Sequence, residues 1–318
     1  MSRVLNDNPS VSEETRQKVR DAIAALNYTP NPIARRLSTG RTLTIGVIVP
    51  FFTLPDFVKR LQGVQQALAE SEYDLVLFNV ETVSQRERYF NDLPRHTRVD
   101  GVLIIGLPMT NLHISQFREA EIPIVLIDVE HAEVHQVIVD HVLGGYMATR
   151  HLIELGHRRI AFVSDYLEDA FGFMANRQRF EGYCQALEEA QLTRYPEYQQ
   201  QGEHGREAAR KMGHALFSLQ EPPTAIFASS DTQAIGVLEA AREQGIKVPE
   251  QLSIIGYNDI RDADYMDLTT IHQPLFNSGL VGAQILLRAI EGPPSSMMDK
   301  IVLPLELIQR KTTAPYTR

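Results

Sequence analysis

Several features of exported and membrane proteins are missing from this sequence. Its 318 residues include a single cysteine, Cys184, so no disulfide can form within the chain, which fits a reducing cytosol. The N-terminus has no apolar signal core, and no stretch approaches the roughly 18 apolar residues of a membrane span. These absences disfavour a secreted protein and predict a cytoplasmic one with no membrane partner.

Motifs for common catalytic chemistry are also missing. The sequence has no G-x-G-x-x-G or G-x-x-x-x-G-K-[ST] stretch to cradle a nucleotide phosphate, and no G-x-S-x-G turn. His131 and His135 are four residues apart, but we expect them in a loop without a carboxylate signature. Cys184 fits a small packing residue beside Tyr183 better than a nucleophile. We therefore expect no metal, no cofactor and no enzyme activity.

Positive charge is scarce overall but not at the beginning of the chain. The net charge is −9, yet residues 1–41 carry seven basic and four acidic residues and are +3, while the remaining residues are −12. A basic segment before an acidic body is expected when only one end contacts nucleic-acid phosphates. A solvated charged helix would produce the same small difference.

The beginning of the chain is predicted to be helical. Residues 12–27 place apolar side chains on one helical face, with Ser12 as a candidate cap. The proline-containing residues 28–32 end this helix, residues 33–37 can form one or two further helical turns, and residues 38–42 are typical of a linker.

From residue 43 onward, short continuous apolar runs alternate with amphipathic helical segments. Such runs are typical of buried parallel strands with crossover helices, and their number favours two doubly wound lobes rather than one sheet. Ligands in these folds bind at the carboxyl ends of the strands. The runs expected as strands are residues 43–49, 74–80, 101–106, 123–128, 159–164, 225–229 and 253–257.

Residues 2–42, SRVLNDNPSVSEETRQKVRDAIAALNYTPNPIARRLSTGRT, resemble the end of the DNA-binding region of the lactose/galactose-repressor family of bacterial transcription regulators. Further resemblance lies, in family order, in GGYMATRHLIELGH, IGYND, LTTIHQP and LPLELIQRKTT at residues 144–157, 255–259, 268–274 and 303–313. The resemblance covers essentially the whole chain. It implies an α/β protein with two doubly wound parallel-sheet lobes, similar to periplasmic binding proteins, preceded by a partial helical DNA-binding headpiece.

The resemblance also implies a domain organisation. Residues 1–30 would form a partial helix-turn-helix headpiece, and residues 31–42 a hinge helix and linker. The N-terminal lobe would comprise residues 43–136 plus 273–300, and the C-terminal lobe residues 137–272 plus 301–318.

Three groups of residues would contact DNA by this resemblance. Ser2, Arg3 and Asn6 would belong to the second half of a recognition helix in the major groove. Ser12 and Thr15 would donate to phosphate at the start of the next helix. In the hinge segment, Leu37 would be an apolar wedge in the minor groove, although an ordinary buried leucine would look the same. The hinge residues expected beside it are Asn31, Ala34 and Arg35.

The sequence departs from the family at its start. The family pattern begins about twenty residues earlier, with a first helix, a turn and the front of the recognition helix. Here Met1 stands where the family usually has valine. A valine codon can also serve as a bacterial start, so we hypothesise a start site annotated too late. The chain as written is then expected to bind operator DNA weakly and with little sequence preference.

Polar residues after the strands suggest an effector site between the lobes. Arg179 occupies the place of a ligand-binding arginine in the family, and His204 a place that is usually aromatic. In purine-sensing members a second arginine and a threonine stand where this chain has Phe173 and Ala175, which speaks against a purine. Arginine forks, carboxylates and aromatic faces suit a sugar or sugar phosphate. The full set expected to bind the effector is Asp56, Phe57, Phe173, Arg179, His204, Ser230, Asp231 and Asn258.

Structural roles are possible for several of these residues. Asp231 could cap the helix after its strand, and Asn258 or Asp259 could simply form a turn. Arg179 could be a surface ion-pair partner.

The function implied is that of a homodimeric repressor whose operator binding is controlled by the effector. Two rival interpretations stay open: a truncated, stand-alone sugar-binding protein without specific DNA binding, and an enzyme on a doubly wound fold. No heptad segment follows Thr313, so a dimer is expected rather than a tetramer built by such a helix.

Overall fold

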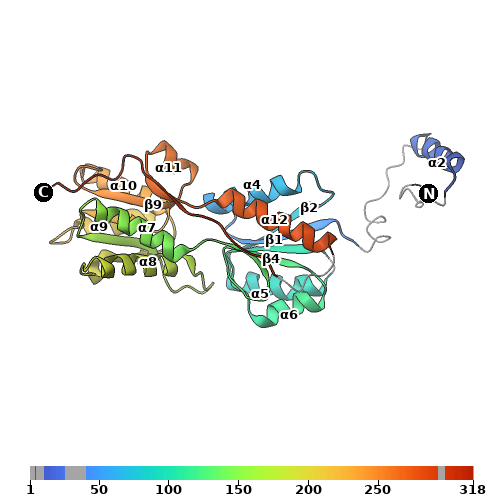
Figure 1. Cartoon of the computed structure of the whole chain (residues 1–318), viewed down its shortest axis with the longest axis horizontal. Helices are drawn as coiled ribbons and strands as arrows, with labels where there is room; N and C mark the ends of the chain where they lie inside the picture. Colours follow the sequence, from blue (N-terminus) through green and yellow to red (C-terminus); the bar gives the residue numbers. More distant parts are fainter. Residues whose placement is uncertain (1–3, 5–10, 26–40, 97, 293–297, 318) are drawn as a thin grey trace. The chain divides into compact units, whose positions relative to one another are not determined.

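The computed structural model describes residues 4, 11–25, 41–96, 98–292 and 298–317, and the chain divides into two compact units, residues 1–43 and 44–318 (Figure 1). The smaller unit contains α2 (Glu13–Ala25). The hydroxyl of Ser12 accepts the backbone N–H of Thr15 at 3.4 Å, so Ser12 caps α2 as expected. Val4, the one described residue before Val11, is helical and 7% exposed. The expected hinge helix lies outside the described residues.

The larger unit begins with a sheet of strand order β11-β5-β4-β3-β1-β2, in which every neighbouring pair is parallel. Three of its interior strands, β1, β3 and β4, are almost entirely apolar and fully buried, as expected for a sheet covered on both faces. Helices α4 and α12 pack on one face, and α5 and α6 lie on the other (Figure 1). The elements are β1 (Thr44–Pro50), α4 (Pro55–Leu68), β2 (Asp74–Val80), α5 (Val83–Asp92), β3 (Gly101–Ile105), α6 (Asn111–Glu119), β4 (Ile124–Ile127), β5 (His135–Ile138), α12 (Leu275–Glu291) and β11 (Lys300–Val302).

The second sheet has the order β12-β10-β9-β8-β6-β7, with only the β10–β12 pair antiparallel. Helices α7 and α8 pack together, as do α9 and α10. The elements are α7 (His141–Glu154), β6 (Ile160–Asp165), α8 (Ala175–Glu189), β7 (Gln199–Gly202), α9 (Arg206–Phe217), β8 (Ala225–Ala228), α10 (Asp231–Glu243), β9 (Ser253–Asn258), α11 (Arg261–Tyr265), β10 (Thr269–His272) and β12 (Glu306–Ile308).

The chain crosses between the two lobes three times. It leaves the first sheet after β5, returns between β10 and α12, and crosses again between β11 and β12. The lobe boundaries expected at 136/137 and 300/301 fall inside β5 and β11. Both strands stay in the first sheet beyond these points, because β5 pairs with β4 and with β11. Each lobe is therefore built from separate parts of the sequence.

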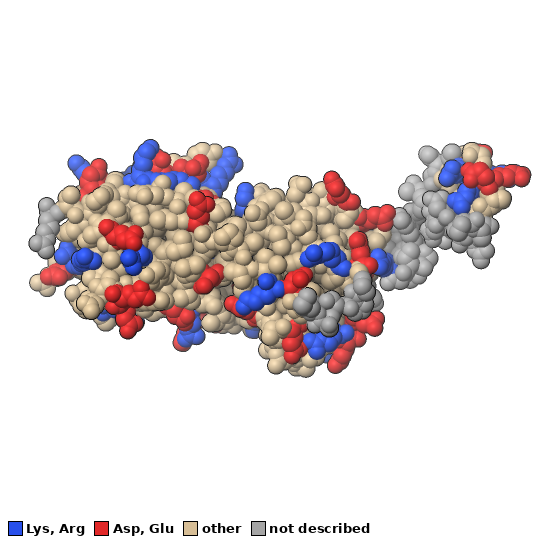
Figure 2. Space-filling view, viewed as in Figure 1, with Lys and Arg blue, Asp and Glu red and all other residues tan. Residues whose placement is uncertain are grey.

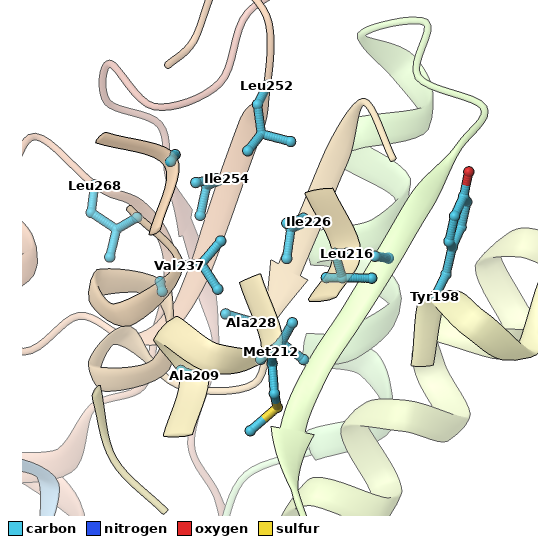
Figure 3. Packing of buried hydrophobic residues seen from close by; sticks show 14 of the residues in the cluster. Tyr198, Ala209, Met212, Leu216, Ile226, Ala228, Val237, Leu252, Ile254 and Leu268 are labelled. Carbon is cyan, nitrogen blue, oxygen red and sulfur yellow. The ribbon is translucent and has the colours of Figure 1, made fainter. Parts of the chain in front are cut away.

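Each lobe has its own apolar core. In the second lobe, Met212 and Leu216 of α9 and Val237 of α10 pack against Ile226 and Ile254 of the sheet (Figure 3). Burial of such side chains stabilises the fold by about 1.5–3 kcal/mol each. The cores hold the strands rigidly, so the loops at the strand ends are well positioned for binding.

The seven strands expected from the sequence are all present, with ends that agree to within one residue. Among the others, β5, β7 and β10 carry polar residues and no continuous apolar run. His135 is one example: it begins β5 rather than lying in the expected loop, because its backbone pairs with Val125 in the sheet.

The helix hydropathy and the surface charge bear on membrane and nucleic-acid partners. Among the described residues, no helix has the length and hydropathy needed to cross a bilayer. Figure 2 shows acidic and basic side chains interspersed over the visible face of residues 44–318. That face carries no patch of one sign.

Candidate functional site

Two residues expected to contact DNA lie at the start of α2. The hydroxyls of Ser12 and Thr15 are exposed and 2.9 Å apart. They can donate to a phosphate beside a helix N-terminus, although Glu13 and Glu14 add negative charge there. The remaining expected contacts lie outside the described residues: Ser2, Arg3, Asn6, Asn31, Ala34, Arg35 and Leu37.

Arg179, in the second turn of α8, is the most enclosed cation of the second lobe's candidate site. Its side chain is buried, and Nη1 donates to the carbonyl oxygen of Ser229 at 2.6 Å. Nε donates to Nδ1 of His141 at 3.3 Å, and the guanidinium carbon lies 3.8 Å from the ring centre of Tyr257. This stacked, buried arginine differs from the surface ion-pair partner that the sequence left open.

Asp128 links the partners of Arg179 to the first lobe. It follows β4 and accepts hydrogen bonds from Nη2 of Arg60 at 2.6 Å, from Nε2 of His141 at 2.9 Å and from Nε2 of Gln273 at 3.2 Å. His141 and Gln273 stand at two of the three chain crossings. We call this set the crossover network: Arg60, Asp128, His141, Arg179 and Gln273.

The charge states in the crossover network follow from its geometry. Burial alone would raise the pKa of Asp128, but Arg60 and His141 hold it well below its usual range. Burial lowers the pKa of His141, and Arg179 adds to this against the opposing charge of Asp128. A neutral His141 accepts from Arg179 at Nδ1 and donates to Asp128 from Nε2. The network therefore centres on an aspartate bound by one arginine, a neutral imidazole and an amide, with Arg179 joined to the imidazole and the amide.

Glycine packing sets the position of Arg179. A methyl group at Gly145 of α7 would overlap the carbonyl oxygen of Arg179, and one at Gly182 of α8 would overlap that of Val142. The two helices can approach this closely only because both contact positions lack a side chain. The backbone of Arg179 is thus held against α7.

Three expected effector residues lie in or against the first lobe. Asp56, in the first turn of α4, accepts from Nη1 of Arg60 at 3.3 Å, and the ring of Phe57 lies 5.8 Å from the Arg60 guanidinium carbon. Phe173 follows β6 of the second lobe, yet it stacks on Phe171, with ring centres 5.2 Å apart, and packs against the first lobe's core. The loop after β6 therefore bridges the lobes.

Ser230 and Asp231 have local partners. Ser230 caps α10, because its hydroxyl accepts the N–H of Gln233 at 3.3 Å. Asp231, which the sequence offered as a possible cap, is not the capping residue. Asp231 is fully buried and accepts from the Thr270 hydroxyl at 2.6 Å and from the Ile260 N–H at 2.9 Å. Burial raises the pKa of Asp231 to about 7, with these bonds opposing. Its contacts fasten α10 to neighbouring strand ends.

Asn258 ends β9 with an unsatisfied acceptor. It is 8% exposed, has φ 111°, and its Oδ1 has no hydrogen-bond partner among the described residues. Asp259 beside it, with φ 57°, accepts from Arg310 at 2.7 Å and from His272 at 3.0 Å. Both residues make a turn, but a buried amide oxygen without a partner is costly unless something binds it.

His204 follows β7 and contacts the end of β6. Its Nδ1 lies 3.0 Å from Oδ2 of Asp165. A pocket of about 430 Å³ opens beside it, and of the expected effector residues only His204 is among those that line it. The lining residues are Gln201, Gly202, Glu203, His204, Glu207, Ala208, Lys211 and Met212.

Sequence reasoning missed Arg60, Asp128, His141, Asp165 and Gln273. Asp128 and Asp165 stand where their strands end. This position was the only feature of the sequence that could have marked them as site residues. His141 and Gln273 are 132 positions apart, and only the crossings bring them to one carboxylate. Arg60 lies three residues after Phe57 and four before Val64, on the buried face of α4, but an arginine gives no apolar signal there.

Profiles of known protein families match part of each of the two units. Residues 1–31 match the profile described as bacterial regulatory proteins of the lacI family, and residues 149–313 match that of a periplasmic binding protein-like domain. The chain is 35% identical over 296 residues to the HTH-type transcriptional repressor PurR of Vibrio atlanticus, covering 92% of this chain and 87% of that protein. The PurR repressor of Actinobacillus pleuropneumoniae is 34% identical, with coverage of 92% and 87%.

Solved structures give the same relationship. The lac repressor dimer bound to operator and the anti-inducer ONPF superposes with a TM-score of 0.85 and 26% identity, covering 98% of this chain and 94% of that chain. A CelR–cellobiose complex has a TM-score of 0.75 and 29% identity, with coverage of 98% and 94%. A ribose-bound lacI-family regulator of Enterococcus faecium has a TM-score of 0.76 and 29% identity, with coverage of 86% and 100%.

Proposed function

The chain belongs to the lacI family of bacterial regulatory proteins, and on this premise we propose that it is a cytoplasmic homodimer that represses transcription from a palindromic operator. It is a DNA-binding regulator controlled by a small-molecule effector. The match of residues 1–31 to the regulatory-protein profile favours this function over a stand-alone sugar-binding protein. The proposal is a binding function rather than catalysis.

The effector in this proposal is a sugar or sugar phosphate bound where the carboxyl ends of both sheets meet. Arg179 and the free Oδ1 of Asn258 offer a donor fork and an acceptor, and Phe57 offers an aromatic face. The ribose and cellobiose bound by two structural neighbours support this ligand class.

The crossover network is the single observation that carries the proposed control mechanism. A ligand hydroxyl that engages Arg179 competes with Ser229, His141 and Gln273 for its N–H groups. Since Asp128 holds His141 and Gln273 together with Arg60 of the first lobe, moving Arg179 changes how the lobes are joined. The ligand shifts the operator-binding state by as much as its affinities for the two arrangements differ.

The homodimer in this proposal forms at least partly through β2. This strand is an edge of the first sheet, and its Leu75 and Val76 are 38% and 40% exposed. Exposed apolar residues on an edge strand favour pairing with another chain. A two-fold dimer would present two headpieces to a palindrome.

The experiment that tests the function is selection of bound duplexes from random DNA by the full chain, followed by titration with ribose, cellobiose and ribose 5-phosphate. We expect a palindromic consensus that the chain as written binds weakly, with little discrimination between bases, and a change in its affinity with at least one sugar. Recovery of no consensus would contradict operator recognition by this chain. A consensus whose affinity no sugar changes would leave the regulator but contradict the sugar effector.

A further inference from the structure

Asp165, at the carboxyl end of β6, gathers three side chains from three different parts of the second lobe. Its Oδ1 accepts from Nε2 of Gln233 at 2.7 Å, and its Oδ2 accepts from Nδ2 of Asn176 at 3.1 Å and from Nδ1 of His204 at 3.0 Å. The carboxylate itself stays 28% exposed. We call these four residues the Asp165 cluster.

The hydrogen bonds of the cluster fix which groups are left for a ligand. Both polar atoms of the Gln233 side chain have partners, because its Oε1 also accepts from the hydroxyls of Ser229 and Ser230 at 2.7 and 3.2 Å. Asn176 donates to Asp165, and its Oδ1 has no hydrogen bond among the described residues. His204 directs Nδ1 to the carboxylate, and its Nε2 makes no hydrogen bond among the described residues. The exposed side of the cluster therefore presents two acceptors, the Asp165 carboxylate and Oδ1 of Asn176, beside Nε2 of His204.

Asp165 is the less compensated of the two carboxylates near His204. Burial lowers the pKa of His204, but Asp165 and the charge of Asp56 outweigh it and raise the pKa. Asp56 belongs to the first lobe and is paired with Arg60, whereas His204 is the only ion-pair partner of Asp165 among the described residues. The negative charge of Asp165 is therefore balanced by no arginine or lysine in the described part of the chain.

The arginines near these carboxylates are already engaged. Arg60 is 1% exposed and binds Asp56 and Asp128. Arg179 uses Nε and both terminal nitrogens on His141, Ser229 and Gln273. Beside His204, Lys211 is 73% exposed and lies 3.7 Å from a carboxylate oxygen of Glu207. A phosphate ester carries a charge of about −2 and needs several donors at once, whereas a sugar hydroxyl needs only one exchange with the present partners of Arg179.

A buried amide oxygen at the same edge of the sheet is a further hydrogen-bond acceptor. Asn258 ends β9, which is separated from β6 by β8 alone, and the carboxyl ends of these parallel strands share one edge of the sheet. Its Oδ1 is the unpartnered buried oxygen described above. Hydroxyl groups donate to such acceptors without adding charge.

We propose that the Asp165 cluster and Oδ1 of Asn258 form a subsite for the hydroxyl groups of an uncharged sugar, and that this subsite rejects the phosphorylated form. The inference rests on the proposed sugar effector and narrows it. Asp165 sets the preference through its charge, while Asn176 and Gln233 hold the carboxylate in place.

The test compares each sugar with its own phosphate ester on the full chain. Calorimetric titration of ribose against ribose 5-phosphate, and of glucose against glucose 6-phosphate, should show at least one parent sugar bound at least about tenfold more tightly than its ester. Asp165→Asn should weaken binding of that sugar by about tenfold or more, because a hydrogen bond to a charged group is replaced by a neutral one, and should reduce the preference over the ester. Asp262→Asn, the same change at an exposed residue of α11, is the matched control and should leave both affinities unchanged.

Each remaining outcome decides against the subsite. Tighter binding of the esters, or equal binding of sugar and ester, overturns it while leaving the sugar effector in place. An unchanged preference in a folded Asp165→Asn protein also overturns it. If none of the four compounds binds and operator affinity responds to none of them, the sugar effector fails together with the subsite. The comparison on the unmodified chain decides the question even if Asp165→Asn does not fold.

Discussion

Arg60 donates a hydrogen bond to Asp128 across 2.6 Å, in an interior where only 1% of the arginine side chain is exposed. The same guanidinium binds Asp56, so one buried cation is shared by two carboxylates of the first lobe. Asp128 also accepts from His141 and Gln273, which stand at two of the three crossings, so this ion pair couples the stability of the first lobe to the connection between the lobes.

Replacing Arg60 should be costly. Arg60→Met leaves two carboxylates without their buried partner, and we expect the free energy of unfolding to fall by about 3–5 kcal/mol. Chemical denaturation measures this. Arg118→Met, which removes an exposed arginine 2.6 Å from Glu133, is the control and should cost no more than about 1 kcal/mol. Equal losses in the two variants would argue against a special role for the buried pair.

The guanidinium of Arg179 should be essential for effector control. Arg179→Lys keeps the charge but loses the planar fork that reaches Ser229, His141 and Gln273 together. We expect the response of operator affinity to the bound sugar to fall at least about tenfold, measured by fluorescence anisotropy. Arg177→Lys, at an exposed position of the same helix, should respond like the unmodified protein. A normal response from Arg179→Lys would contradict the proposed mechanism.

A methyl group between α7 and α8 should disturb the site. Gly182→Ala places a carbon against the carbonyl oxygen of Val142 and forces the helices apart. Overpacking of this kind costs about 1–3 kcal/mol, which denaturant unfolding can measure. Glu188→Ala, on the exposed side of α8, should change stability by less than about 0.5 kcal/mol. A stability loss no larger than that of the control would show that the helices tolerate wider spacing.

His157 should make stability depend on pH. Its ring is buried against Thr224, Ser253 and the carbonyl of Ala314, and burial lowers its pKa. When the pH falls below the ordinary pKa of 6.5, His157 is protonated in the unfolded chain but stays neutral in the folded chain. The free energy of unfolding therefore falls as the pH falls through this range. One such proton contributes a slope of up to about 1.4 kcal/mol per pH unit.

The measurement for His157 is the free energy of unfolding between pH 5 and pH 7. His157→Gln keeps a polar side chain that cannot take up a proton, so its stability should fall less steeply toward acid pH. Parallel curves for the two proteins would mean that His157 does not contribute to the pH dependence.

Edge strand β2 should control the oligomeric state. Val76→Lys places a charge on an apolar position that is 40% exposed in the single chain, so the fold should tolerate it while a dimer interface should not. Light scattering should show a mass near twice the 35.9 kDa of one chain for the unmodified protein and near 35.9 kDa for the variant. Leu112→Lys, at the 66% exposed position on α6, should stay dimeric. A dimeric Val76→Lys protein would move the interface elsewhere.

The sequence by itself determined the fold class and the apolar strands of the sheet interiors, but not the interior strands β5 and β10, which carry polar residues. Runs such as residues 101–105 are apolar at every position, which suits only a strand covered on both faces. The family was identified from sequence motifs that occur in family order along the chain. The sequence was also enough to single out Arg179 and the polar residues that follow the strands.

Only the tertiary structure decided how those residues are connected. Strand β7, with the sequence QQQG, has no apolar signal and exists because its backbone pairs with β6 at the edge of the second sheet. The crossover network joins side chains that are far apart in the sequence and separated by chain crossings, such as Asp128 and Gln273, 145 positions apart. Local periodicity records which face of an element is apolar. It carries no information on which polar groups from distant segments meet, because that depends on how the two lobes are threaded together.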